Sequence, residues 1–239
     1  MAALPILVFV KTATSESLDT IAIKNRPFVV ISMMENAYEK VNDYTATFHK
    51  RHLLRGKVQP EETVYLKFKK PFKLYMKWLK GPHEGREALY VQGMNKNKMA
   101  GHEGGLLGLF NWNLDPKGKI AMREQRHPLT DLGIGRLVEI ITGDAKRGAA
   151  AKELNLVYLG EEEIYGRKVW HIRMDLPPKK DYYSPRSDGW IDEESHLPLK
   201  VILYGPDGEF IESFGYSDLR LNPGLSDAEF EKDYKDYNY

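Results

Sequence analysis

The chain has 239 residues, and its 35 Lys and Arg residues nearly balance 34 Asp and Glu residues, which leaves a formal net charge of +1. This balance does not favour a nucleic-acid partner, and the absence of cysteine excludes disulfides, thiolate metal sites, cysteine catalysis and a lipid-modified N-terminal cysteine. A chain of this length can bury a full hydrophobic core, and no apolar run in it approaches the ~20 residues of a membrane-spanning helix.

The N-terminal segment, residues 1–24, is predicted to be a tail outside the folded domain. Residues 2–10 form a short apolar run, and Ala13 lies where a signal peptidase could cleave, so the segment has features of a signal-peptide remnant. It lacks the basic stretch that normally precedes such a run. An edge strand or a plain tail is therefore the alternative interpretation.

Two segments have the spacing of amphipathic helices, because apolar residues recur in them at three- and four-residue steps. In residues 27–41 this stripe consists of Phe28, Ile31, Met34, Tyr38 and Val41. In residues 131–147 it consists of Ile134, Leu137, Val138 and Ile141. Thr130 or Asp131 is expected to cap the second helix, and the glycines at 133 and 135 would allow another element to approach its first turn closely.

Residues 62–80 show the clearest strand pattern. Val64, Leu66 and Phe68 alternate with polar or basic residues, and so do the apolar residues after the turn at Pro71. Such period-two alternation predicts a β-hairpin with one dry and one wet face. By the same criteria, further strands are expected at residues 43–54, 88–91, 120–124, 156–162, 168–176, 189–192, 197–203 and 209–221, with residues 95–99 forming another short strand or a turn.

Strands that follow one another with few helices between them predict an antiparallel sheet rather than βαβ units. We therefore expect an α+β, mainly antiparallel fold: a strongly curved, unclosed β-barrel with two covering helices on its concave dry face. The single domain should span residues 25–232. Residues 233–239, rich in tyrosine and aspartate, are expected to be a frayed C-terminus.

The order of these elements resembles the LolA/LolB group, the bacterial outer-membrane lipoprotein carriers and sorting proteins. It is most similar to a related bacterial family of unknown function. The resemblance rests on four stretches in series: DYTATFH at 43–49, FKKPFKLYMKW at 68–78, GWIDEESHLPLK at 189–200, and the closing segment 218–230. Residues 126–136 match no motif of the carriers.

The resemblance implies an unclosed barrel in which helices form a lid over an apolar cavity. In the carriers this cavity receives acyl chains. It also implies an exported protein of the periplasm or cell envelope. Because the chain lacks cysteine, we do not expect an anchored receptor of the LolB type.

The apolar strand and helix faces are the first candidate site. Their members either fill an ordinary core or line a cavity for a greasy ligand, and methionine and tryptophan suit irregular apolar partners. The candidate ligand-binding residues are Met34, Phe48, Leu66, Phe68, Leu74, Met76, Trp78, Ile134, Leu137, Trp170, Ile172 and Met174.

A basic face is the second candidate. Between residues 49 and 80 there are ten Lys and Arg residues against Glu61 and Glu62, whereas acidic residues predominate after residue 205. The basic face is either simply solvated or docks on an anionic membrane surface or an acidic envelope protein. Nucleic acid is disfavoured because only Tyr65 and Tyr75 could stack bases there.

The segment that leads into the second helix invites an acid–base hypothesis, because His127 lies close to Asp131. No nucleophile motif accompanies it, so an entry turn is the simpler interpretation. Arg126 and His127 are instead candidates for contacting a ligand head group, and Leu107 and Phe110 for lining the cavity mouth. His49 and His52 lack metal-ligand spacing, so neither a metal nor another cofactor is expected.

We therefore predict a monomer that binds a lipid, a lipoprotein acyl chain or another apolar ligand between sheet and helices, without catalysis. The alternative is an envelope sensor or scaffold that has this same fold and binds another protein. A hydrolase is a more distant third possibility.

Overall fold

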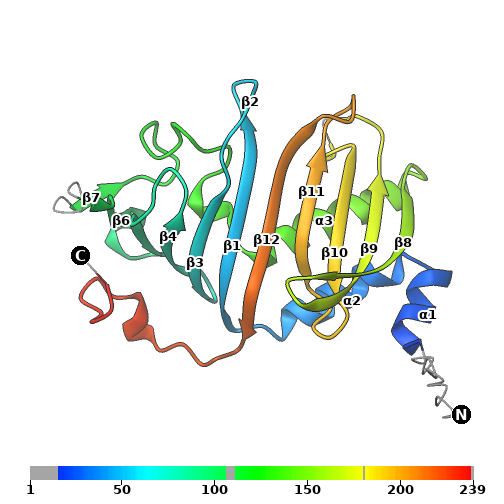
Figure 1. The fold of residues 1–239 in the computed structure, drawn as a ribbon, viewed down its shortest axis with the longest axis horizontal. Helices are drawn as coiled ribbons and strands as arrows, with labels where there is room; N and C mark the ends of the chain where they lie inside the picture. The colour runs from blue at the N-terminus through cyan, green and yellow to red at the C-terminus, as the bar shows by residue number, and fades with distance from the viewer. Residues whose placement is uncertain (1–15, 106–110, 180, 238–239) are drawn as a thin grey trace, which may run out of the picture.

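The computed structural model describes residues 16–105, 111–179 and 181–237, and within them twelve strands form one antiparallel sheet (Figure 1). The strands are β1 (Asp43–Leu54), β2 (Lys57–Val58), β3 (Glu62–Lys69), β4 (Lys73–Lys80), β5 (Glu87–Val91), β6 (Met99–His102), β7 (Asn111–Leu114), β8 (Asn155–Ile164), β9 (Arg167–Asp175), β10 (Arg186–Asp192), β11 (Pro198–Tyr204) and β12 (Phe210–Leu221). The predicted fold class is confirmed.

The sheet consists of two meanders that meet at its centre. Its strand order is β7-β6-β5-β4-β3-β1-β12-β11-β10-β9-β8, with β2 paired to the end of β1. In the central pair, β1 lies antiparallel to β12, so that Tyr44 faces Leu221 and Phe48 faces Tyr216. Because β7 and β8 form opposite edges and do not pair, the sheet curves without closing.

In the part of the chain that the structure describes, three α-helices accompany the sheet: α1 (Leu18–Asn25), α2 (Val29–Glu39) and α3 (Ile134–Ala150). Short 3-10 helices lie at η1 (Asn95–Asn97), η3 (Leu129–Asp131) and η4 (Asp227–Phe230). The two predicted helices are thus present, and Figure 1 shows them crossing one face of the sheet. No helix in the described ranges is long and apolar enough to cross a membrane.

The main core lies between the sheet and α2 and α3. The stripe residues Ile31, Met34 and Ile134 are buried there against strand residues such as Phe48 and Trp170. The dry face predicted for the 62–80 hairpin is buried as well, because Val64, Leu66, Phe68, Leu74, Met76 and Trp78 all belong to this core.

The start of α3 corrects the predicted cap. Thr130 and Asp131 lie in η3 instead, and Gly133 occupies the cap position with φ +113. The hydroxyl oxygen of Tyr44 accepts a hydrogen bond from the Ile134 N–H at 3.1 Å. A strand side chain therefore satisfies the helix end, which no local cap motif could reveal.

Both predicted ends of the domain need correction. Within the expected tail, Ser17 caps α1, Ile23 is fully buried, and Trp170 Nε1 donates to Thr20 Oγ1 at 2.8 Å. At the other end, the ring of Tyr237 stacks on Tyr75 with centroids 3.8 Å apart. Residues 18–24 and 233–237 therefore pack against the domain, because long-range partners cover apolar groups that look unpartnered in sequence.

The strand predicted at residues 120–124 is wrong. This stretch forms turns, with local hydrogen bonds from Met122 N–H to Gly118 O at 3.0 Å and from Arg123 N–H to Ile120 O at 3.3 Å. It belongs to a longer segment, residues 115–132, that leaves the sheet after β7. We call it the cover segment, because it lies over the face of β4–β7.

The packing of α2 on α3 depends on a glycine. A Cβ added at Gly135 would lie 2.1 Å from atoms of the Tyr38 ring, whereas one added at Gly143 in the same helix would meet only the end of the Arg147 side chain at 3.3 Å. The expectation that Gly135 allows a close approach is confirmed.

We predict that Gly135→Ala lowers the free energy of unfolding by about 1–3 kcal/mol through overpacking against Tyr38. Gly143→Ala should instead raise it by about 1 kcal/mol, because alanine favours a helix interior. Urea unfolding of both variants tests this. Equal stabilisation by the two substitutions would show that Tyr38 does not constrain the helix pair.

Candidate functional site

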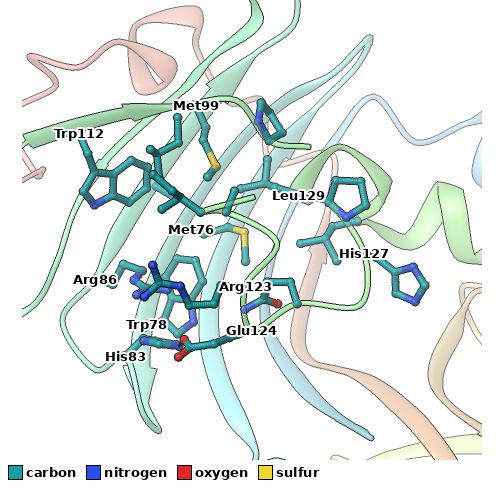
Figure 2. Close-up of a pocket in the computed structure, with 18 of the residues that line it drawn as sticks. Met76, Trp78, His83, Arg86, Met99, Trp112, Arg123, Glu124, His127 and Leu129 are labelled. Carbon is teal, nitrogen blue, oxygen red and sulfur yellow. Dashed lines mark ion pairs between the residues drawn. The ribbon is translucent and has the colours of Figure 1, made fainter. Parts of the chain in front are cut away.

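A cavity of about 350 Å³ lies between the sheet face of β4–β7 and the cover segment. Its apolar walls come from Met76 on β4, Met99 on β6, Trp112 on β7 and Leu129 on the cover segment. Figure 2 shows these side chains gathered in one half of the cavity, with His83, Arg86 and Glu124 in the other half. The cavity is therefore apolar at one end and charged at the other.

Trp112 can form a wall because its strand partner is glycine. Gly101 lies directly opposite Trp112 in the β6–β7 pair, and a Cβ there would lie 2.2 Å from the indole ring and 2.4 Å from Glu87 O. The ring consequently lies against the sheet. Its Nε1 is buried and has no hydrogen-bond partner among the described residues, which leaves one donor in the cavity wall to be satisfied.

A buried ion pair lies next to the charged end and contacts Trp78 in the cavity wall. Trp78 Nε1 donates to Glu62 Oε2 at 2.6 Å, and Lys50 Nζ lies 3.6 Å from Glu62 Oε1. Burial raises the pKa of Glu62, but Lys50 and Trp78 outweigh burial and leave this pKa below its usual value. Burial also lowers the pKa of Lys50. The pair fixes the orientation of the Trp78 ring along the cavity wall.

The charged end itself carries two arginines. Arg86 lies over the Trp78 ring, 5.6 Å from its centroid, and pairs with Glu103 at 2.8 Å. Arg123 comes from the cover segment and extends toward Arg86 in Figure 2. Within the described residues the Arg123 guanidinium has no ion pair. A guanidinium of this kind is suited to bind a carboxylate or phosphate.

His83 lines the same end and connects it to the cover segment. Its Nε2 lies 3.1 Å from Glu124 Oε2. Burial, and then the nearby Arg86 charge, lower the pKa of His83. The side chain is thus biased toward the neutral form, in which it can accept or donate a hydrogen bond to a ligand head group.

The carboxylate of Glu212 attaches the cover segment to the centre of the sheet. Glu212 on β12 is 1% exposed, and three groups converge on it: His127 Nε2 at 3.0 Å, Tyr183 Oη at 2.7 Å and Arg126 Nε at 3.3 Å. Glu212 and Tyr183 both meet His127 at the same nitrogen, Nε2. This geometry is a structural attachment rather than a relay through both ring nitrogens.

The predicted ligand-binding residues separate into distinct places. Met76 and Trp78 line the 350 Å³ cavity, and so does the head-group candidate His127. Phe68 lines a groove of about 680 Å³ beside α2 and α3, and Phe48 and Leu137 line a space of about 50 Å³. Leu107 and Phe110 lie outside the described residues. The remaining apolar candidates are buried core: Met34, Leu66, Leu74, Ile134, Trp170, Ile172 and Met174.

Sequence reasoning missed most of the cavity walls. Met99, Trp112 and Leu129 lie on short or irregular elements without a readable period, and Arg86 and Arg123 lie in turn-rich stretches. Arg126, the other head-group candidate, instead pairs with Glu212 and donates to Leu53 O at 3.2 Å. A hint was available in Gly101, whose place inside a strand suggests that a bulky group approaches closely.

The basic face predicted between residues 49 and 80 is partly covered by the chain itself. Lys67 pairs with Glu229 at 3.1 Å, and Asp227 pairs with Lys69 at 2.7 Å and Lys73 at 2.9 Å. Lys69 and then Lys73 lower the pKa of Asp227 to about 2. The acidic C-terminal segment therefore neutralises three of the lysines that were expected to face solvent or a partner.

We predict that Glu212 makes stability pH-dependent. Burial raises its pKa, but His127, Tyr183 and Arg126 outweigh burial and hold it below the ordinary value of 4.5. The stabilisation is thus present above pH 4.5 and is lost as the pH falls through the lowered pKa. Urea unfolding between pH 7 and acidic pH should show this fall in the free energy of unfolding.

Glu212→Gln should flatten that pH dependence and destabilise the protein at pH 7 by about 1–3 kcal/mol, because hydrogen bonds to a charged group are lost. The control is Glu194→Gln, whose side chain is 88% exposed. If both variants keep the wild-type pH profile, Glu212 does not attach the cover segment as described.

Several solved structures are similar to this chain. One is a LolA-superfamily protein from Nitrosomonas europaea, with 13% identity, a TM-score of 0.36, and coverage of 85% of this chain and 97% of that one. Another is the lipoprotein LppX from Mycobacterium tuberculosis, with 15% identity, a TM-score of 0.49, and coverage of 83% and 96%. A LolA-superfamily protein is among these matches, in line with the resemblance expected from the sequence.

A third is the MucA/MucB complex from Pseudomonas aeruginosa, in which 85% of this chain matches 60% of the other at 14% identity, with a TM-score of 0.45. A search of curated protein sequences found no match. A family model described as "Protein of unknown function (DUF1571)" matches residues 41–239, which is most of the chain. The chain therefore belongs to the DUF1571 family.

Proposed function

We propose that this protein binds an amphiphilic ligand, an acyl chain with an anionic head such as that of a lipid or lipoprotein, in the 350 Å³ cavity. The observation that carries the proposal is the polarity of the cavity: apolar walls at one end and Arg86 and Arg123 at the other. No chemistry is required of the protein. The setting we infer is the bacterial cell envelope.

The apolar end supports this function by its size and composition. The volume falls within the range of roughly 300–1,000 Å³ for small-molecule sites, which bury most of the ligand against apolar walls. Met76, Met99 and Trp112 supply adaptable surface, and each buried methylene of a chain contributes about 0.8 kcal/mol. The apolar walls thus suit an acyl chain.

The charged end supports an anionic head. Arg86 is paired with Glu103, whereas Arg123 has no ion pair among the described residues and therefore has hydrogen-bond donors to offer a head group. Its exposure allows the head group to remain partly hydrated, which avoids the cost of burying a charge. A carboxylate or a phosphate satisfies this arrangement equally well.

Two other functions have weaker support. Hydrolysis would need a group at the cavity that attacks the ligand, but the His127 cluster is committed to the buried Glu212. The second function is binding of another envelope protein. Such a partner would bind independently of the cavity interior, so the test below distinguishes it from a cavity ligand.

The test uses delipidated, refolded protein and a fluorescent fatty acid, with native mass spectrometry of the undenatured protein to detect bound lipid. Ile120 lines the cavity and is 65% exposed, so Ile120→Asp should leave the fold intact while placing a charge beside the chain. We expect affinity to fall about tenfold or more, equivalent to about 1.4 kcal/mol.

The matched control is Leu159→Asp on the edge strand β8, a leucine that is 44% exposed and does not line the cavity. It should bind the probe as the wild type does. The proposal is wrong if delipidated wild-type protein takes up no acyl probe. A partner protein captured equally well by the wild type and by Ile120→Asp would then favour the sensor or scaffold.

Leu132 should limit the length of the bound chain. Its side chain lines the 350 Å³ cavity, the small 50 Å³ space and the 680 Å³ groove, so it separates all three. We predict that Leu132→Ala joins them and shifts preference toward longer fatty acids in a binding series. Leu129→Ala, which enlarges the first cavity without lining the other two, should shift it less. Equal shifts would contradict a separating role for Leu132.

A further inference from the structure

Two loops near the cavity carry cations and no acid. Residues 54–60 contain Arg55 and Lys57, and residues 116–123 contain Lys117, Lys119 and Arg123, with no Asp or Glu in either stretch. All five side chains are exposed. We call these five residues the basic rim.

The two loops, both positively charged, also contact each other. Arg55 Nη2 donates to the backbone oxygen of Arg123 at 3.4 Å, and His52 Nε2 lies 3.1 Å from Glu124 O. The first loop is the β1–β2 tip, which projects past the end of the sheet in Figure 1. The β1–β2 tip and the Arg123 end of the second loop therefore lie side by side.

Two acidic residues flank the rim, and each has a partner within the chain. Asp115 Oδ1 accepts the Lys117 backbone N–H at 2.9 Å, and Glu124, whose side chain is 59% exposed, lies 3.1 Å from His83 Nε2. In contrast, Lys67, Lys69 and Lys73 on the outer face are neutralised by the C-terminal segment. The five rim cations have no ion pair among the described residues, so their charge is available to a partner.

Exposed aliphatic side chains lie among these cations. Ile120 is 65% exposed between Lys119 and Arg123, and Val58 is 42% exposed beside Lys57. Ile120 and Arg123 also line the cavity, so the cavity opens at the rim. Cations around projecting aliphatic groups match a surface that is anionic at its boundary and apolar just beneath it.

We propose that the basic rim docks the protein on an anionic lipid bilayer, with the mouth of the cavity facing the membrane. Lysines and arginines contact the lipid head groups, and Ile120 and Val58 enter the boundary with the acyl chains. The arrangement suits a fluid bilayer better than an acidic protein, because a bilayer supplies negative charge and apolar surface without a shaped partner pocket. Entry of a ligand from this membrane rests on the proposed function. The docking itself does not depend on it.

The test is co-sedimentation with vesicles of phosphatidylglycerol and phosphatidylethanolamine, compared with vesicles of phosphatidylcholine alone. Wild-type protein should bind only the anionic vesicles, and more weakly as salt rises. Lys57, Lys117 and Lys119 do not line the cavity. Each is expected to strengthen binding about fivefold, so replacing all three by glutamine should weaken it on the order of 100-fold.

The matched control replaces Lys40, Lys152 and Lys168 by glutamine, which removes the same charge from exposed positions away from the rim. It should bind anionic vesicles nearly as the wild type does. The proposal is overturned if wild-type protein does not prefer anionic vesicles, or if both triple variants lose binding equally.

A soluble fluorescent fatty acid, measured without vesicles, separates this proposal from the proposed function. The rim variant should bind that probe as the wild type does. Probe uptake without vesicle binding in the wild type would overturn the docking and leave the cavity function intact. Vesicle binding that depends on the rim lysines, without probe uptake, would support the docking and overturn the cavity function.

Discussion

The pairing of β1 with β12 is the contact on which the rest of the structure depends. Both strands have twelve residues, and their register brings Tyr44 opposite Leu221 and His52 opposite Glu212. The pair joins the meander of β1–β7 to that of β8–β12, so one continuous sheet can curve around α2 and α3. Because β1 and β12 are far apart along the chain, their pairing requires a large loss of chain entropy. The buried core must offset this loss.

The concave face is filled in two different ways. Beneath β8–β12, helices α2 and α3 supply a regular stripe of large side chains, and the spaces left there are only about 20 Å³ and 50 Å³. Beneath β4–β7, the cover segment is made of turns, which cannot present side chains at a regular spacing. The 350 Å³ cavity remains there for this reason. The candidate site is thus a consequence of irregular backbone over a regular sheet.

Polar contacts hold the cover segment in place, together with the packing of Leu129 and Leu132 against the core. Arg126 Nη1 donates to Leu53 O at 3.2 Å, and Arg126 and His127 both reach Glu212. Such contacts contribute modestly when exposed and strongly when buried. Buried Glu212 is therefore the principal attachment, while the neighbouring basic rim remains free to meet an anionic surface. The binding proposal concerns the side of the cover segment that lines the cavity, and the docking proposal concerns its exposed side.

Period-two and helical patterns were sufficient to predict the long strands, both covering helices and an open antiparallel sheet, because these patterns record which side of each element is buried. They missed the short strands β2 and β7 and predicted a strand at 120–124 that is absent. They also identified Met76 and Trp78, although a buried face cannot reveal whether a helix or a cavity lies opposite it. Tertiary structure alone decided that Trp170 faces Thr20, that Asp227 covers Lys69 and Lys73, and that Trp112 and Arg123 meet at one cavity. These contacts join distant segments, and local sequence carries no record of them.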